Sequence, residues 1–540
     1  LDIRLRDGKR ENSGSASLGF VNSHLSWEGP LSERSSFMFS LRKMYYDLVQ
    51  DALDANSTSP RYNFYDMSTK FSFNAGSENI ISLSAFLSAD NVYSPHSSDI
   101  EYDIQWKNAA LSLSWIQLLS NARISNTSLS YVSYQFRSVL NDTIARAGSA
   151  DYYSVSHLQD LQLKKDFEVY FATNMLGKIG IDAVFHNYNL KYSDVFTDLL
   201  DYSEGKGKGI MSFEAAAFIQ AQWQILPFLK ANLGSRIYYF NEEKTVHPEP
   251  RLSLVYNLTD DLDIKCAYAS AHQFLHLVIR NDISLPTDLW YPSAGNIEPE
   301  SSEQYVFGIQ KNFENNIYQM TLETYYKRMH NLYEFKDNLV FNPGNSVVDL
   351  FTKGEGEAYG MEFYLGKTEG EITGWIGYTL SWTRRKFDEL NYGRLFYPRF
   401  DRRHDISLVL SYAVTDNFNI GATWTYASGQ GFTLPVSQYF ISGIDADPSG
   451  RIQFDYTARN EYKLPAYHRL DLNIVYKFNW GRYGMETYFN ITNAYNRNNP
   501  FAYYASLENK NSGTVNVKYP VFHSISLFPF IPAAGVKIRF

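Results

Sequence analysis

Three short stretches of the sequence carry residue types that do chemistry in many proteins. His272 and His276 are four residues apart, the spacing that puts two metal ligands on one face of a helix. Asp445 and Asp447 precede a Pro-Ser-Gly turn and have the spaced carboxylates of a calcium loop. Residues 205–209 (GKGKG) have the glycines and lysines of a phosphate-binding loop. Each stretch has to be weighed against its surroundings.

None of these stretches meets the remaining requirements of its site. The two histidines lie where a strand is expected to enter a loop, so helical spacing does not apply, and no HExxH motif accompanies them. The aspartates lack the other ligand positions of a calcium loop, which favours an Asx turn. The GKGKG stretch has neither the strand-to-helix setting nor the glycine spacing of a phosphate loop. We therefore expect no metal, no cofactor and no enzymatic reaction.

The densest group of charges is at residues 399–405 (RFDRRHD). Arg399, Arg402 and Arg403 have the charge to bind an anionic ligand. The same arginines can instead pair with the carboxylates of this stretch and form a charge ladder on a protein wall. A second basic group, residues 384–386 (RRK), lies at the other end of the same loop and has the charge to bind lipopolysaccharide phosphates.

The two longest loops that the sequence predicts, residues 275–300 and 428–466, are rich in aromatic side chains. Ligand sites are mostly apolar, with a few placed polar groups. Loops of this composition either line a ligand site or pack on one another, and the sequence supports both interpretations equally. The candidate lining residues are His272, Trp290, Tyr291, Arg399, Arg402, Arg403, Phe432, Tyr439, Phe440 and Tyr456.

The elements that must position these side chains are β-strands. In residues 469–478, apolar side chains occupy every second position from Leu470 to Phe478, and most positions between them are polar. Residues 405–414 and 417–426 show the same alternation. A period of two indicates a strand with one apolar and one polar face. Such segments recur along the whole chain at the roughly 10-residue length of a membrane-spanning strand.

Short and long connections alternate between these strands. The short ones, such as residues 259–261 and 415–417, consist of turn-forming residues. A barrel with tight turns on one side and long loops on the other produces this alternation, whereas a soluble sandwich does not. We predict an all-β, 22-stranded antiparallel transmembrane barrel with both termini on the short-turn side. The long connections are residues 48–61, 141–154, 275–300, 336–356, 428–466 and 496–521.

The composition agrees with a barrel and excludes other classes of protein. The chain has 540 residues, 44% of them apolar, which excludes disorder. No run reaches the roughly 18 apolar residues of a spanning helix. The single Cys266 excludes a disulfide scaffold and is expected to be an inert wall residue. The net charge of −9 gives no footprint for nucleic acid. Aromatic pairs such as Tyr325–Tyr326 and Tyr503–Tyr504 predict girdles at the membrane boundaries.

Several motifs along the whole chain resemble one family when taken in order. They are residues 1–8 (LDIRLRDG), 25–30 (LSWEGP), 285–299 (LPTDLWYPSAGNIEP), 354–370 (GEGEAYGMEFYLGKTEG), 397–406 (YPRFDRRHDI), 464–471 (LPAYHRLD) and 490–500 (NITNAYNRNNP). The sequence resembles the barrel of a TonB-dependent outer-membrane receptor, most closely the Bacteroidota type with a carboxypeptidase-regulatory-like domain and a plug upstream. The alternating end, which stops on Phe540, resembles the C-terminal signal read by the barrel-assembly machinery.

The resemblance implies a division of the chain and a function. Residues 1–10 would be the last strand of a plug domain and its exit, and residues 11–540 the barrel. The family uses TonB, acting on a segment upstream of this chain, to import a ligand too large or too scarce for porins. The bacterial outer membrane is the implied location. Implied partners are outer-membrane lipid and lipopolysaccharide, TonB, the barrel-assembly machinery and, as an option, other outer-membrane or lipoprotein subunits.

Two alternatives to an importer remain at this level. A barrel whose plug is truly absent would be a passive pore. A barrel whose plug lacks a TonB-binding segment would be a non-transporting scaffold of an outer-membrane complex. The upstream sequence distinguishes the three, since fold alone does not settle function.

Overall fold

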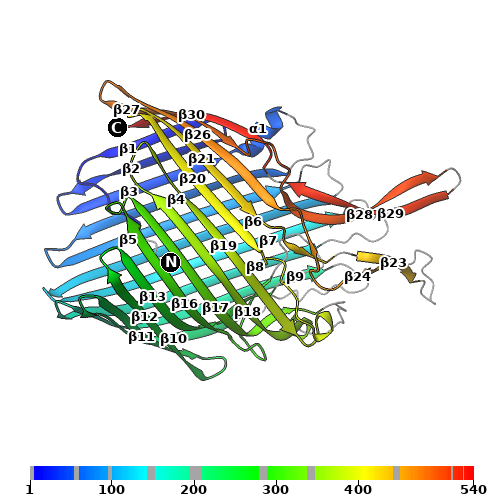
Figure 1. Ribbon diagram of the computed structural model, residues 1–540, viewed down its shortest axis with the longest axis horizontal. Coiled ribbons are helices and arrows are strands. Elements are labelled where there is room, and N and C mark those ends of the chain that lie inside the picture. Colours follow the sequence, from blue (N-terminus) through cyan, green and yellow to red (C-terminus); the bar gives the residue numbers. More distant parts are fainter. Residues whose placement is uncertain are drawn as a thin grey trace.

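The computed structural model is a closed antiparallel β-barrel with long connections at one end (Figure 1). The first and last strands of the chain close it, because β1 pairs with both β2 and β30. The structure describes residues 5–53, 60–94, 100–142, 152–194, 209–278, 289–336, 347–433, 435–441, 451–512, 515–526 and 528–540.

The barrel sheet has 22 strands. Its first eleven are β1 (Ser13–Gly19), β2 (Asn22–Ser32), β3 (Ser35–Met44), β4 (Arg61–Asn74), β5 (Asn79–Tyr93), β6 (Ile100–Ser120), β7 (Arg123–Asp142), β8 (Tyr152–Ala172), β9 (Met175–Asp194), β10 (Ile210–Leu226) and β11 (Leu229–Phe240). The remainder are β12 (Thr245–Thr259), β13 (Leu262–Gln273), β16 (Glu300–Phe313), β17 (Tyr318–Phe335), β18 (Phe351–Lys367), β19 (Ile372–Phe387), β20 (His404–Thr415), β21 (Phe418–Ala427), β26 (Tyr467–Trp480), β27 (Tyr483–Thr492) and β30 (Ile531–Arg539).

The other elements lie in the connections. One helix, α1 (Tyr46–Leu53), and two 3-10 turns, η1 (Val347–Leu350) and η2 (Asn391–Gly393), are present in the described part of the chain. Among those residues, no helix has both the length and the apolar character to cross a bilayer. The four small sheets are β14 (Leu275–Val278) with β15 (Leu289–Pro292), β22 (Gly431–Phe432) with β25 (Tyr462–Lys463), β23 (Pro435–Ile441) with β24 (Arg451–Tyr456), and β28 (Pro500–Ser512) with β29 (Val515–Ser526).

The predicted strand number and the alternation of short and long connections are both confirmed. The predicted strand length is wrong for much of the barrel, because β6 and β8 each run for 21 residues. Backbone pairing between these strands continues past the length that a membrane requires, so ladder hydrogen bonds extend toward the long-loop end. The hairpins inside the loops were not predicted either. Two of them, β23–β24 and β28–β29, project from that end of the barrel (Figure 1).

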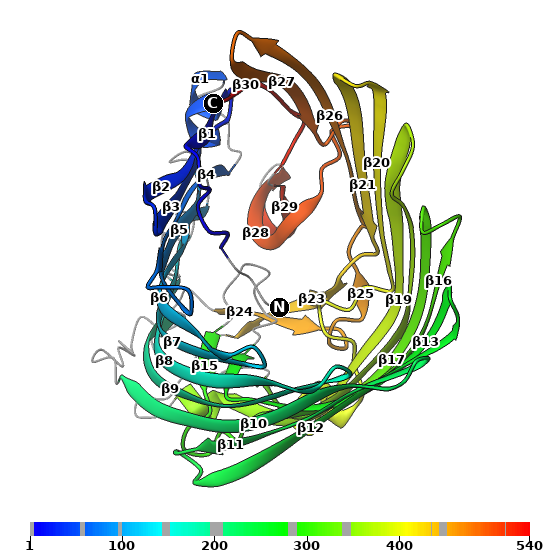
Figure 2. The ribbon, with the colours of Figure 1, turned by 90° about the vertical axis from the view of Figure 1, so that its left-hand side faces the viewer.

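The segment before β1 shows which wall side chains face the lumen. Residues 5–12 turn into the interior of the ring (Figure 2). The Asp7 carboxylate binds the Lys70 ammonium of β4 at 2.8 Å. The Lys9 ammonium binds the Glu28 carboxylate of β2 at 3.2 Å. Because a strand points alternate side chains to opposite faces, these contacts assign the inner face of β2 and β4.

Strand register carries this assignment around the seam. The Glu28 face of β2 pairs through β1 with the Arg539 face of β30. The Arg539 guanidinium binds Glu486 of β27 at 2.7 Å, and Glu486 stands directly opposite Lys477 of β26, so Lys477 shares its face. The alternation in residues 469–478 and 535–540 predicts that the apolar phase faces lipid and the polar phase faces the lumen, and the register confirms this. The lumen-facing residues are Asp471, Asn473, Lys477, Lys537 and Arg539, and the lipid-facing ones are Leu472, Ile474, Tyr476, Val536 and Ile538.

The aromatic side chains of the outer wall form a row rather than adjacent pairs. Tyr268, Tyr305, Tyr326, Tyr359 and Trp382 stand opposite one another across five consecutive strands of the barrel. Rings with an apolar body and a polar tip suit the membrane–water boundary.

The girdle assignment of adjacent aromatic pairs therefore needs correction. Neighbours on a strand point to opposite faces, so Tyr326 lies in the outer row and Tyr325 points inward. The pair Tyr503–Tyr504 lies in β28, a loop hairpin outside the barrel sheet.

Accessibility of the two ends of the barrel should follow the connection lengths. In a Cys266→Ser background, a cysteine at Tyr392 in connection 388–403 should react with a membrane-impermeant maleimide on intact cells. A cysteine at Asp416 in a short turn should not react until the cells are opened. Labelling at Asp416 alone would invert the topology. The loop position Ser449 offers the same test but lies outside the described residues.

Candidate functional site at the outer mouth

The long-loop end of the barrel, here called the outer mouth, is organised by two buried carboxylates. Glu334 stands at the end of β17, and Asp401 lies in connection 388–403. Each has about 1% of its side chain exposed and each binds two cations. Buried charges have to be paired, so these carboxylates determine how the surrounding loops meet.

Glu334 connects three segments that are distant in sequence. Its two carboxylate oxygens bind Arg385 of β19 at 2.8 Å and Arg459 of connection 428–466 at 2.7 Å. The Arg459 guanidinium also lies 5.4 Å from the centre of the Phe396 ring. Beneath the ion pairs, Leu332, Phe387, Leu390 and Phe396 form a buried apolar cluster. The base of the longest loop is thereby fixed to the wall.

Asp401 likewise holds neighbouring segments together, in the next long connection along the chain. Its carboxylate accepts a hydrogen bond from the Thr383 backbone N–H at 2.9 Å and binds Lys463 at 3.2 Å and Arg403 at 3.4 Å. The Arg403 guanidinium lies over the Trp382 ring at 4.6 Å. For Arg403, the charge-ladder interpretation therefore describes the structure better than a free ligand-binding cation.

The other predicted cations divide between the two faces of the wall. Arg399 and Arg402 are half-buried in connection 388–403. In the stretch proposed to meet lipopolysaccharide, Arg385 points inward to Glu334, so its assignment to the outside is wrong. Arg384 is paired with Glu357 at 3.6 Å, in line with the cross-strand pairing of these two positions.

The β14–β15 hairpin brings Trp290 and Tyr291 together with the wall rather than leaving them free. The Tyr291 ring packs edge-on against Phe351 at 5.3 Å, beside a buried cluster that includes Tyr333 and Phe335. Trp290 donates a hydrogen bond to the Tyr134 side chain of β7. Figure 2 shows β15 inside the ring near β8. These contacts support loop packing for the two residues.

The two histidines of the HQFLH stretch have separate environments. His276 is fully buried, with its Nε2 2.8 Å from the Ser293 hydroxyl and its Nδ1 3.2 Å from Glu300. His272 lies 4.6 Å from the ring of His247 and 3.5 Å from the buried carboxylate of Glu249. Within the described residues, no group of three His, Cys, Asp or Glu side chains is placed to hold a metal ion.

The remaining aromatic candidates lie in connection 428–466. Phe432 is half-buried in β22, whose backbone pairs with Tyr462 of β25. Tyr439 and Phe440 belong to β23 and Tyr456 to β24, which pair with each other. The aspartates at 445 and 447 and residues 205–208 of the GKGKG stretch lie outside the described residues. A hairpin thus carries three of the aromatic candidates beyond the wall.

The inner end of the lumen holds the segment before β1. Two cations of this segment, Arg6 and Lys9, share the buried Glu28 carboxylate at 3.2 Å. Partial burial alone would raise the pKa of Asp7, but hydrogen bonds from Lys70 and Ser72 outweigh it, and the pKa lies below its ordinary value. Of the strand predicted for residues 1–6, residues 1–4 lie outside the described part, and Leu5 and Arg6 are not in a strand.

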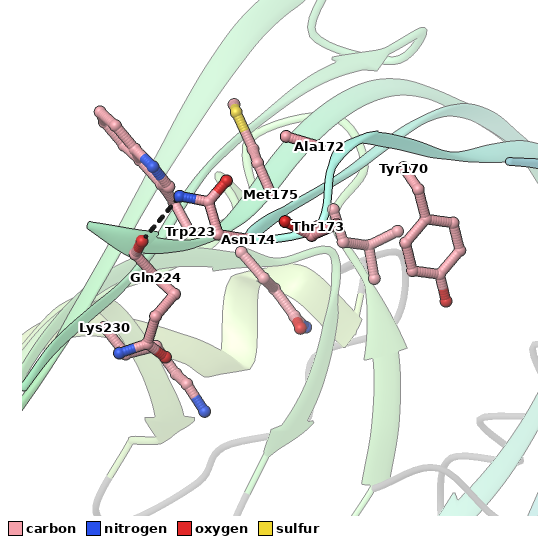
Figure 3. A pocket seen from close by; sticks show the side chains of 10 residues that line it. Tyr170, Ala172, Thr173, Asn174, Met175, Trp223, Gln224 and Lys230 are labelled. Carbon is pink, nitrogen blue, oxygen red and sulfur yellow. Dashed lines mark hydrogen bonds between the residues drawn. The ribbon is translucent and has the colours of Figure 1, made fainter. Parts of the chain in front are cut away.

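A crevice opens at the short-turn rim, away from the outer mouth (Figure 3). Tyr170, Met175, Trp223 and Lys230 are among the residues that line it. The Asn174 side-chain amide donates to the Gln224 backbone carbonyl oxygen at 3.1 Å and joins the β8–β9 turn to β10. The lining of the crevice is more apolar than polar, and none of the predicted ligand residues belongs to it.

The family model described as TonB dependent receptor-like, beta-barrel, matches residues 29–494. The chain belongs to this family. That assignment agrees with the closed 22-stranded sheet and with both sets of connections. A search of curated proteins finds no match.

Solved structures of TonB-dependent receptors share the fold over nearly the whole chain. The siderophore receptor PirA from Acinetobacter baumannii has 14% identity and a TM-score of 0.66, covering 99% of this chain and 81% of its own. The ferripyoverdine receptor of Pseudomonas aeruginosa has 14% identity and a TM-score of 0.63, covering 99% and 72%. The ferric-catecholate import receptor Fiu from E. coli K12 has 10% identity and a TM-score of 0.65, covering 99% and 82%. At these identities the likeness shows the fold. The Bacteroidota subtype is not addressed by these matches and stays a prediction.

The residues that sequence reasoning missed in this receptor are Glu334, Arg459 and Lys463, whereas Arg385 was named but given the wrong role. A signal for Glu334 exists in the sequence, because it is a single carboxylate inside the apolar run Leu-Tyr-Glu-Phe at residues 332–335. A charge in such a run is buried with a partner. Its partners are 51 and 125 residues away, and nothing in the sequence identifies them.

Proposed function

We propose that this TonB-dependent receptor barrel belongs to an active importer of ferric siderophores. Membership of the family over residues 29–494 is the observation that carries the proposal. It is supported by the similar solved structures, which are named as siderophore and ferric-catecholate receptors. Energy would come from TonB, acting through a segment upstream of residue 1, and no covalent chemistry on the ligand is required.

The proposed division of labour follows the two ends of the lumen. Residues 1–10 would form the exit of an upstream plug domain, in keeping with the ion pairs that hold residues 6–9 against the inner wall. Residues 11–540 would form the barrel. At the outer mouth, the exposed parts of connections 388–403 and 428–466 would contact the ligand. Arg402, His272 and Phe432 are half-buried and stay candidates for lining the ligand site.

Uptake measured in a receptor-deficient Gram-negative strain tests the importer proposal. Cells expressing the full-length gene should accumulate radiolabelled iron from ferric enterobactin or ferripyoverdine, and deletion of tonB should abolish the accumulation. Accumulation that persists without TonB would indicate a pore. If the cells neither bind nor take up either complex, the proposed ligand class is contradicted. An upstream plug without a TonB-binding segment would favour a scaffold of an outer-membrane complex.

A further inference from the structure

The turn at Asn391–Gly393 in connection 388–403 has a left-handed backbone, which the described residues show over three consecutive positions only here and in the short turn Glu314–Asn316. Asn391, Tyr392 and Gly393 have φ values of 50°, 56° and 70°, so three consecutive residues are left-handed. Only glycine adopts this region without a steric penalty from its side chain. Tyr392 is also 93% exposed, so its ring gains nothing from burial that would offset the strain. Strained backbone of this kind persists only when its surroundings hold it.

The surroundings of the turn hold it from two sides. Leu390, the residue before the turn, is fully buried in the apolar cluster with Leu332 and Phe396. The Asn391 side-chain oxygen accepts a hydrogen bond from the Arg459 backbone N–H at 3.1 Å. The turn is therefore fastened at one end by packing and at its first left-handed residue by the base of connection 428–466.

Arg459 is itself held by Glu334. The Arg459 side chain is 5% exposed, and its guanidinium binds the Glu334 carboxylate at 2.7 Å. The same carboxylate binds Arg385, which exchanges both backbone hydrogen bonds with Phe396 on the far side of the turn. One buried carboxylate therefore fixes both strands of chain that flank Tyr392.

We propose that Glu334 is a positioning residue for recognition at the outer mouth. Through Arg459 and Arg385 it holds the left-handed turn, and the turn presents Tyr392 to a ligand that arrives from outside. Leu395, two residues beyond Gly393, is 58% exposed and is a second apolar side chain of this connection that faces solvent. A tyrosine presented on a rigid support suits contact with an aromatic or apolar face of a ligand. The ligand-contact part rests on the proposed function, whereas the positioning part does not.

A spin label at Tyr392→Cys in a Cys266→Ser background tests the positioning. The label should report a rigid backbone in the parent protein and a mobile one after Glu334→Gln, which keeps the shape and removes the charge. Amide exchange across residues 388–394 should become roughly tenfold faster or more in that variant. Glu486→Gln is the matched control, because Glu486 also binds an arginine on the lumen face, far from the turn. Glu334→Asp, which keeps the charge, should restore part of the order.

The outcomes separate positioning from general damage and from the import proposal. Increased mobility at residue 392 with unchanged exchange in β20 and β21 supports the inference. Unchanged mobility and exchange in Glu334→Gln would overturn it, whatever the transport result. If Glu334→Gln fails to form heat-resistant barrel, Arg459→Lys provides the second variant with the same two readouts. Loss of ferric siderophore uptake in Tyr392→Ala, with normal folding, supports ligand contact, and normal uptake of a transported complex contradicts it.

Discussion

Arginine in place of Ile474 is expected to remove most of the folded barrel from the outer membrane, whereas arginine in place of Asn473 leaves it folded. Ile474 points to lipid near the middle of β26, and Asn473 points to the lumen. An arginine facing lipid at the midplane costs about 2–4 kcal/mol, and a lumenal arginine meets polar groups and water. Adjacent positions thus give opposite results.

The comparison is made on purified outer membranes by gel mobility with and without boiling, since a folded barrel migrates differently from an unfolded one. Both variants add the same side chain one residue apart, so synthesis and secretion are matched. Phe489 of β27, directly opposite Ile474, provides a second lipid-face site at the same depth, where arginine should repeat the loss. Equal yields of folded Ile474→Arg and Asn473→Arg would mean that the strand faces are exchanged.

Residues 1–540 reconstituted in a planar bilayer are expected to conduct ions strongly, and the protein with an upstream plug almost not at all. A 22-stranded barrel is too wide for its own side chains to fill. Small or polar residues such as Ser407, Ser411, Asn419 and Thr423 lie on the lumen face. These side chains hydrogen-bond to water or to an inserted domain but cannot close the interior by packing.

Weak ion selectivity should accompany the conductance, because both signs of charge line the wall. Lys477 and Glu486 stand opposite each other on the lumen face, as do Lys537 and Glu486. Single-channel currents under a salt gradient measure both quantities. A sealed bilayer containing folded residues 1–540 would mean that the outer connections close the lumen themselves. The importer would then lack a moving plug, and the scaffold proposal would become the better one.

The barrel itself could be predicted because its determinants are local. Alternation of apolar and polar residues indicates each strand, as in residues 469–478. The lipid face has to be apolar wherever the chain crosses the membrane. The inner face has to differ from it, so Asp471 and Asn473 were assigned correctly from ten residues of sequence. Turn residues such as Thr415-Asp416-Asn417 fix the ends of the strands just as locally.

The outer mouth could not be predicted in the same way, because its order depends on distant residues. Glu334 orders the loops only through its ion pairs with Arg385 and Arg459. These pairs cannot be predicted from the sequence, because the partners are far apart along the chain. The neighbouring residues Arg384 and Arg385 also have different partners, because their side chains point to opposite sides of the wall. The hairpins inside the loops could not be predicted for a related reason. Residues 500–512 and 515–526 alternate like wall strands, but within the described part of the chain they pair with each other and with no barrel strand.

The seam of the barrel can close only when the two ends of the chain meet. β1 pairs with β30, so that Ser15 stands opposite Arg539, and Val21, Tyr46, Ile531 and Ala533 form a buried cluster beside the junction. These partners are separated by almost the entire chain, and contacts of such separation form late because loop closure precedes any gain. Until β1 meets the nine-residue β30, the sheet is open and has two unpaired edges. Until that moment every N–H and C=O along those two edges needs a temporary partner, which closure of the seam replaces.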